Sequence, residues 1–165
     1  MSDKQISDFY REALGIKTNE KEIYFRAVTH KSYNNSTNNE RLEFLGDAVL
    51  DLIVSQQLFI KNRGANEGFL SIEKSKYVSR QNLNKVAERI LNKNVIKHKS
   101  SYLSKNMLGN TLESIIGAIY IDKGMQTCEK FILKHILQFK TERFLLKNLS
   151  QIINKIFYDK KIKVN

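Results

Sequence analysis

The stretch NNERLEFLGDAVLDLIVSQQLF, residues 38–59, decides the fold and raises the main question about function. Its apolar residues recur at the spacing of a helix that has little exposed surface. Two carboxylates, Glu43 and Asp47, nevertheless stand among them. Because residues four apart share one face of a helix, these two acids project side by side. Burying adjacent carboxylates is costly unless a positive group compensates them, so the pattern indicates a bound cation or a basic partner.

A second apolar segment, NTLESIIGAIYID at residues 110–122, repeats this pattern. Asn110 and Glu113 stand three residues apart, again on one face of the expected helix. Carboxylate and amide oxygens are hard ligands of the kind that Mg²⁺ prefers. We therefore expect the two segments to converge on one metal site. Two alternatives stay open at this point: ion pairs with Lys or Arg, or a solvated acidic stripe.

Helical periodicity continues through most of the chain and predicts an all-α fold. Clean period-two alternation is missing, and the sequence has no proline and only seven glycines. We expect one domain at residues 1–140 and a basic C-terminal helix and tail at residues 141–165. Thr37, three residues before Glu40, is expected to cap the helix that starts near residue 38. The expected helices are 5–14, 20–29, 38–62, 69–78, 80–91, 107–122, 125–138 and 142–158.

The composition favours an anionic partner and a reducing compartment. Lys and Arg number 28 against 17 Asp and Glu in 165 residues, which gives a formal charge of +11. Such a charge attracts nucleic acid or an acidic membrane surface. The single cysteine, Cys128, leaves no intrachain disulfide and fits the cytoplasm. The sequence has neither the apolar core of a secretory signal nor an apolar run long enough to span a bilayer, so we expect no membrane association.

The positive charge is expected to come from the later segments, because the first 50 residues are close to neutral. Eight basic residues are candidates for a phosphate-facing surface, with an ordinary solvated face as the alternative. They are Lys61, Arg63, Lys74, Lys76, Arg80, Lys97, Lys99 and Lys105.

Four short motifs follow one another along the chain: THKSY at residues 29–33, NERLEFLGDAVLD at 39–51, EGFLS at 67–71 and LGNTLESIIGAIYIDKG at 108–124. In this order they resemble the motifs of the ribonuclease III family. The second resembles that family's signature stretch, the third its Glu-Gly-x-Leu-Ser segment and the fourth its second acidic motif. The resemblance covers about residues 20–138, and a run as long as ERLEFLGDA is highly specific.

The resemblance implies a ribonuclease III endonuclease-domain-like helical fold that forms a two-fold homodimer. It also implies an endoribonuclease that cleaves double-stranded RNA with Mg²⁺, for which Mn²⁺ is expected to substitute. The expected products carry 5′-phosphate and 3′-hydroxyl ends, and the expected substrates are ribosomal and other structured precursor RNAs. The family's metal ligands fall on Glu43, Asp47, Asn110 and Glu113. Asp47, Glu113 and Glu43 are the expected catalytic residues.

The resemblance also implies roles outside the metal site. Phe44 falls where the family uses an aromatic knob to enter its dimer partner, and Leu45 belongs to the same expected interface. An ordinary core aromatic is the alternative for Phe44. Glu40 and Glu67 match further acids of the family's substrate-binding valley. Lys74 stands where the family usually has Arg, so a phosphate contact and a free surface lysine are both open.

Two departures from the family pattern support an alternative function. Asn110 stands where the commonest pattern has Asp, so each site carries three carboxylates instead of four. We expect a working enzyme with a higher Mg²⁺ requirement, because the amide keeps the ligand oxygen but not the charge. KNLSQIINKIFYDKK, residues 147–161, resembles only the start of the double-stranded-RNA-binding domain that bacterial members usually add, so we expect a remnant of that domain or none. The alternative is a catalytically weak or inactive RNA-binding, ribosome-associated scaffold.

Overall fold

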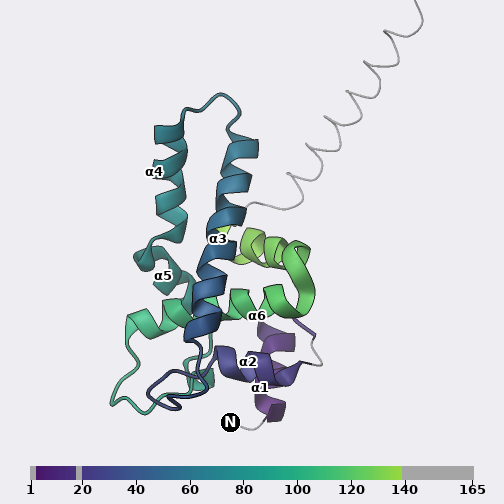
Figure 1. Ribbon diagram of the computed structural model, residues 1–165, viewed down its shortest axis with the longest axis vertical. Helices are drawn as coiled ribbons and strands as arrows, with labels where there is room; N and C mark the ends of the chain where they lie inside the picture. The colour runs from purple at the N-terminus through teal and green to yellow at the C-terminus, as the bar shows by residue number, and fades with distance from the viewer. Residues whose placement is uncertain (1–2, 18–19, 139–165) are drawn as a thin grey trace, which may run out of the picture.

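The crossing of two long helices organises the structure (Figure 1). The computed structural model describes residues 3–17 and 20–138. Its elements are α1 (Asp3–Ala13), α2 (Lys21–Ala27), α3 (Glu40–Lys61), α4 (Glu67–Val78), α5 (Arg80–Ile90), the 3₁₀-helix η1 (Lys93–Val95), α6 (Lys105–Ile132) and the π-helix η2 (Leu133–Leu137). Within these residues the only strand-like pairing is one isolated bridge between Thr29 and Lys97, so the all-α expectation is confirmed.

The expected helices are present within the described residues, with their ends shifted by a few positions. The expected segments 107–122 and 125–138 form α6 and η2, and the break between them falls inside α6 at Gly124. Gly124 has a φ of 74°, which glycine adopts without steric cost, and the helix changes direction there. The expected helix at 142–158 and the tail at 141–165 lie outside the described residues.

Close backbone contact between α3 and α6 requires two glycines. A Cβ on Gly46 would overlap the backbone carbonyl of Glu113, and a Cβ on Gly117 would overlap that of Leu42. The two helices therefore cross backbone against backbone, which brings the acidic segments of both to one place. Figure 1 shows α6 passing across the N-terminal half of α3, while α4 lies beside its C-terminal half.

One hydrophobic core surrounds this crossing. Its fully buried members from α3 and α6 include Leu50, Ile53, Val54, Leu112, Ile115, Ile116 and Ile119. Each such side chain contributes about 1.5–3 kcal/mol of burial free energy, so the crossing is the most strongly packed part of the fold. By contrast, α4 buries none of its residues. None of the helices in the described part of the chain has the length and apolarity needed to cross a membrane.

The N-terminus of α3 differs from the expected capping box. Its N-cap is Asn39, not Thr37, and the Asn39 side chain makes no capping hydrogen bond. The backbone N–H of Thr37 donates to Asn34 Oδ1 at 3.0 Å, and that of Glu40 donates to Asn38 Oδ1 at 3.0 Å. Short Asn side chains bond readily to the backbone two or three residues on. Asn38 therefore supplies the acceptor at the start of α3 that was expected from Thr37, while Asn34 accepts from Thr37 itself.

Backbone hydrogen bonds fix the start of α3 against the rest of the domain. The buried Asn39 donates its N–H to the Thr29 carbonyl at 2.9 Å, and its carbonyl accepts from Ser114 Oγ at 3.2 Å. The segment around Thr29 is held in turn, because the N–H of His30 donates to the Lys97 carbonyl at 2.9 Å. The THKSY motif, the signature helix and the second acidic helix are thus joined where α3 begins.

Candidate active site

One pocket collects acidic side chains from both sequence segments. It lies where α3 crosses α6, and Arg80, the first residue of α5, also lines it. We call it the acidic pocket, and its lining residues are His30, Lys31, Asn39, Glu40, Glu43, Phe44, Asp47, Arg80, Asn110 and Glu113. All four residues expected as metal ligands therefore line one pocket, and the two segments converge as the sequence predicted.

Glu113 is the most deeply buried acid of the acidic pocket, with 3% of its side chain exposed. It stands in α6 next to Ser114, which bonds to the start of α3. Burial raises the pKa of the Glu113 carboxyl to about 7, repulsion from Asp47 and Glu43 adds to this effect, and the guanidinium of Arg80 opposes it. A carboxylate in this position needs a cation beside it to stay charged.

Glu43 and Asp47 stand one turn apart on α3, as the sequence predicted, but their surroundings differ. Glu43 is half-buried, and burial raises its pKa above the ordinary value while Arg80 and Asn110 oppose the rise. Asp47 is exposed. The expectation of an α3 with little exposed surface is therefore wrong for Asp47. One face of α3 lies outside the core, and the exposed Phe44 shares this side of the helix with the pocket.

Arg80 is the cation that compensates these acids. Its Nη1 donates to Asn110 Oδ1 at 2.7 Å and to Glu113 Oε2 at 3.1 Å. From the sequence, Arg80 is only one of eight candidates for a phosphate-facing surface, and no pattern connects it with the acids. The sequence signal that could have located Arg80 was Ser79. The Ser79 side chain caps α5 and so places Arg80 in the first turn of that helix.

The rim of the acidic pocket carries further charged groups. Lys31 Nζ donates to Glu40 Oε1 at 2.7 Å, and both side chains are more than half exposed. His30 Nδ1 lies 2.9 Å from Ser32 Oγ, and burial lowers the pKa of the His30 ring. Glu40 and Glu43 line the same pocket, and a contact of Glu40 with substrate stays a prediction.

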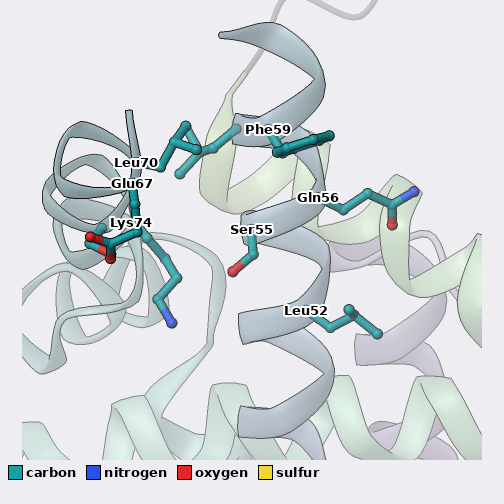
Figure 2. Close-up of a pocket in the computed structure, with 9 residues that line it drawn as sticks. Leu52, Ser55, Gln56, Phe59, Glu67, Leu70 and Lys74 are labelled. Atoms are coloured by element: carbon teal, nitrogen blue, oxygen red, sulfur yellow. The ribbon is translucent and has the colours of Figure 1, made fainter. Parts of the chain in front are cut away.

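Glu67 and Lys74 lie in a second hollow, between α3 and α4 (Figure 2). We call it the apolar groove, and its lining residues are Leu52, Ser55, Gln56, Leu58, Phe59, Glu67, Leu70, Ser71 and Lys74. Ser71 Oγ donates to Glu67 Oε1 at 2.6 Å, and Lys74 Nζ donates to Asp51 Oδ2 at 2.8 Å. Within one chain, neither Glu67 nor Lys74 lines the acidic pocket, and the prediction of a free surface lysine at position 74 is wrong.

Phe44 lines both the acidic pocket and a neighbouring hollow, and Leu45 lines only the neighbouring hollow. Phe44 is 81% exposed, so the alternative of an ordinary core aromatic is wrong. Leu45 is half-buried and packs against the core. An apolar ring this exposed, on a helix fixed by tight packing, is suited to insertion into a partner.

The donor set of the acidic pocket fits a hard divalent cation. Glu43, Asp47 and Glu113 offer carboxylates and Asn110 offers an amide oxygen, the ligand types that Mg²⁺ prefers. Their mutual repulsion is what a bound cation relieves. Among the described residues, no three side chains of the types His, Cys, Asp and Glu lie close enough together to hold a metal ion. Two of the four donors instead accept hydrogen bonds from Arg80.

Comparison with known proteins gives consistent matches to one family. A family model described as Ribonuclease-III-like matches residues 20–139. Ribonuclease 3 of Leptospira interrogans is 43% identical over 140 residues, which cover 76% of this chain and 56% of that protein. Ribonuclease 3 of Bacteroides thetaiotaomicron is 42% identical over 137 residues, which cover 78% of this chain and 44% of that protein. The chain thus spans about half the length of these relatives.

Solved structures give the same result for the fold. A crystal structure of the nuclease domain of ribonuclease III from Campylobacter jejuni is 34% identical, with a TM-score of 0.74 over 79% of this chain and 93% of that one. A second structure of that domain, reported for flexibility in its region of dimer formation, gives a TM-score of 0.73. The fold expected from the sequence motifs is therefore confirmed.

Proposed function

This chain belongs to the ribonuclease III family, and from that premise we propose that it is a Mg²⁺-dependent endoribonuclease that cleaves double-stranded RNA. The proposed products carry 5′-phosphate and 3′-hydroxyl ends, and the proposed substrates are ribosomal and other structured precursor RNAs. One observation carries the proposal: Glu43, Asp47, Asn110 and Glu113 come from two distant segments and line one pocket. Mn²⁺ is proposed to replace Mg²⁺, since it accepts the same oxygen ligands.

The four side chains divide the work of holding the cation. Glu113 is rigid, because the tight crossing of α3 and α6 fixes the backbone that carries it. Asp47 is exposed and offers its carboxylate on the side open to solvent, where a phosphodiester can approach. When bound, Mg²⁺ supplies charge stabilisation for the attacking and leaving oxygens and lowers the pKa of water. Glu43 is half-buried and completes the set of three proposed catalytic carboxylates. Asn110 adds a neutral oxygen.

We propose a two-fold homodimer built around Phe44 and Leu45. The 81% exposure of Phe44 supports this role, as does the dimer-forming region of the Campylobacter jejuni nuclease domain. A two-fold axis places two equivalent acidic pockets on one assembly, and so offers one pocket to each strand of a duplex. Duplex RNA is recognised mainly by its shape, phosphates and 2′-hydroxyls, so little sequence preference is expected.

Glu40, Glu67 and Lys74 are proposed to contact the substrate at a distance from the cation. Glu40 already lies on the rim of the acidic pocket, paired with Lys31. Glu67 and Lys74 line the apolar groove on the neighbouring part of α3, so their contacts with RNA are proposed to lie further along the duplex (Figure 2).

The decisive experiment follows cleavage of a long RNA duplex by the purified protein, in Mg²⁺ and in a chelator. Glu113→Gln keeps the size of the side chain but removes the buried charge, and we expect cleavage to fall about a hundredfold or more. The matched control is Glu88→Gln, because Glu88 is an exposed acid of α5 that does not line the pocket. Cleavage that persists in Glu113→Gln, or in chelator, would overturn the proposal.

A second candidate function is an RNA-binding scaffold with weak or no cleavage. The observation that favours it is the hydrogen bonding of Arg80 to Asn110 and Glu113, which takes up two of the four donors. The same assay separates the two functions when duplex binding is measured alongside cleavage. Binding without cleavage in either Mg²⁺ or Mn²⁺ would establish the scaffold.

A further inference from the structure

Arg80 reaches into the acidic pocket from outside the two acidic segments. It contacts Asn110 Oδ1 and Glu113 Oε2 through a single nitrogen, Nη1, at 2.7 and 3.1 Å. The partners differ in burial: the Glu113 side chain is 3% exposed, while the Arg80 side chain is 44% exposed. The guanidinium therefore has a route to solvent, and the carboxylate has none of comparable size.

The path of the Arg80 side chain is provided by the neighbouring sequence. Ser79 accepts a hydrogen bond from the N–H of Asn82 and so fixes where α5 begins. The side chain then passes over Gly109, where a Cβ would lie 2.8 Å from Arg80 Nη1 and 3.4 Å from its Cδ. Gly109 thus leaves room for the arginine at the point where α6 presents Asn110.

The charge balance explains why a cation is needed at this position. Arg80 is the one basic residue within hydrogen-bonding distance of Glu113 among the described residues, and it also moderates the pKa of Glu43. A buried carboxylate that loses its partner is strongly destabilising, because the remaining charge is neither solvated nor paired. The metal-free pocket is therefore held together by the guanidinium.

We propose that Arg80 is a built-in counter-ion of the acidic pocket, which occupies Asn110 and Glu113 in the metal-free protein and must leave them when a divalent cation binds. The two cations need the same oxygens and repel each other, so they cannot share the donors at hydrogen-bond distance. Arg80 consequently sets the affinity of the pocket for metal. This inference rests on the metal site of the proposed function, and it concerns a positioning residue rather than a catalytic one.

The proposal makes a prediction that a permanent ion pair does not make. If Arg80 competes with the metal, removing its charge tightens metal binding, since the donors are released and repulsion disappears. If Arg80 merely organises the pocket and stays in place, removing it loosens the donors and weakens metal binding or leaves it unchanged. Metal affinity therefore separates the two roles without any measurement of RNA cleavage.

The experiment is a calorimetric titration of the RNA-free protein with MnCl₂, repeated with MgCl₂. We expect Arg80→Gln to bind Mn²⁺ about tenfold more tightly than the unmodified protein. The matched control is Lys85→Gln, which removes one positive charge from an exposed position of the same helix, and it should change the affinity less than twofold. An Arg80→Gln affinity equal to or weaker than that of Lys85→Gln would overturn the proposal.

A second measurement guards against a variant that folds poorly. In chelator, Arg80→Gln should melt at a lower temperature than Lys85→Gln, and added Mn²⁺ should raise its melting temperature by more. Arg80→Lys keeps the charge but not the planar fork, so its Mn²⁺ affinity should fall between those of the unmodified protein and Arg80→Gln. An Arg80→Lys protein that folds normally and binds Mn²⁺ more weakly than the unmodified protein would also overturn the proposal.

The outcomes distinguish this inference from the proposed function. If Mn²⁺ binds all variants with one affinity, the counter-ion role fails while the metal site stands. If neither the unmodified protein nor Arg80→Gln binds Mn²⁺ or Mg²⁺ at millimolar concentration, the metal site itself fails, and the counter-ion role fails with it.

Discussion

Two of the hollows beside helix α3 are built in opposite ways. The acidic pocket lies at the crossing of α3 with α6, where backbone meets backbone at Gly46 and Glu113 is almost fully buried. The apolar groove lies toward α4, which buries none of its own residues and leaves Phe59 69% exposed (Figure 2). The tight crossing fixes charged groups at defined positions, whereas the loose contact leaves apolar surface available to a partner.

The ion pairs of the two hollows follow the same contrast. In the acidic pocket, Arg80 pairs with a carboxylate that has 3% of its side chain exposed. In the apolar groove, Lys74 pairs with Asp51, and these side chains are 34% and 41% exposed. Water screens the second pair more than the first, because Glu113 is almost fully buried, so the shorter 2.8 Å bond of the second pair does not make it the stronger one. Packing density therefore decides which of the charged pairs around α3 matter most.

The largest expected effect comes from the tight crossing. Gly46→Ala should lower the free energy of unfolding by about 3 kcal/mol or more, because the new methyl group meets the backbone of α6, which cannot move without breaking core contacts. Urea denaturation followed by circular dichroism measures this change. The matched control is Gly68→Ala on α4, where the nearest atom to the added Cβ is Asn66 Oδ1 at 3.7 Å.

Gly68→Ala should leave stability unchanged or raise it by a few tenths of a kcal/mol, about what the better helix propensity of alanine supplies near a helix end. Equal stabilities of Gly46→Ala and Gly68→Ala would mean that the crossing is as loose as the groove. The contrast between the two hollows would then be lost.

The next largest effect concerns self-association. Phe44→Ala should weaken the proposed dimer by about 2 kcal/mol, as loss of an aromatic anchor does, while the monomer keeps its stability because the ring is 81% exposed. Sedimentation equilibrium gives the dimer affinity, and thermal melting gives the stability. Phe59→Ala in the apolar groove is the comparison. A loss confined to Phe59→Ala would move the interface from Phe44 to the groove.

The sequence predicted the fold class and the meeting of the two acidic segments in one pocket, because both depend on local patterns. Helical periodicity gave α3 and α6, and the acids spaced three or four residues apart fell on shared faces as expected. The convergence of Glu43 and Glu113 also followed, since two apolar helices bearing acids must place them against a common partner. Gly46 and Gly117 then set how closely those helices meet.

What the sequence could not predict depends on contacts between distant residues. The sequence did not reveal that Asp47 is exposed, because an apolar helix face that binds a partner protein has the same residue pattern as a face that packs in the core. The pairing of Arg80 with Glu113 joins positions on different helices, and no spacing rule links them. Thr37 was assigned as a cap by a local rule, but the equally local bonds of Asn34 and Asn38 supplied the acceptors instead.

A smaller effect tests the neutral ligand of the acidic pocket. Asn110→Asp should reduce the Mg²⁺ concentration for half-maximal RNA cleavage several-fold to about tenfold, because it adds a charge beside the cation. The gain in Mg²⁺ affinity is smaller than an added charge alone would give, because the new carboxylate also binds Arg80 more strongly than the amide does. Asn94→Asp, at an exposed position of η1, adds the same charge elsewhere and serves as the control. An unchanged Mg²⁺ requirement in Asn110→Asp would show that charge does not limit metal binding.

The smallest effect is expected at the ion pair of the apolar groove. A double-mutant cycle with Lys74→Gln and Asp51→Asn should give a coupling free energy of less than about 1 kcal/mol, because both side chains are more than a third exposed. The cycle is measured by urea unfolding at low and high salt, and the coupling should shrink as salt rises. A coupling above about 2 kcal/mol that salt does not reduce would mean that Lys74 anchors α4 to α3. Its proposed contact with RNA would then have to break a structural bond, and Lys74 would no longer be a reasonable substrate-binding residue.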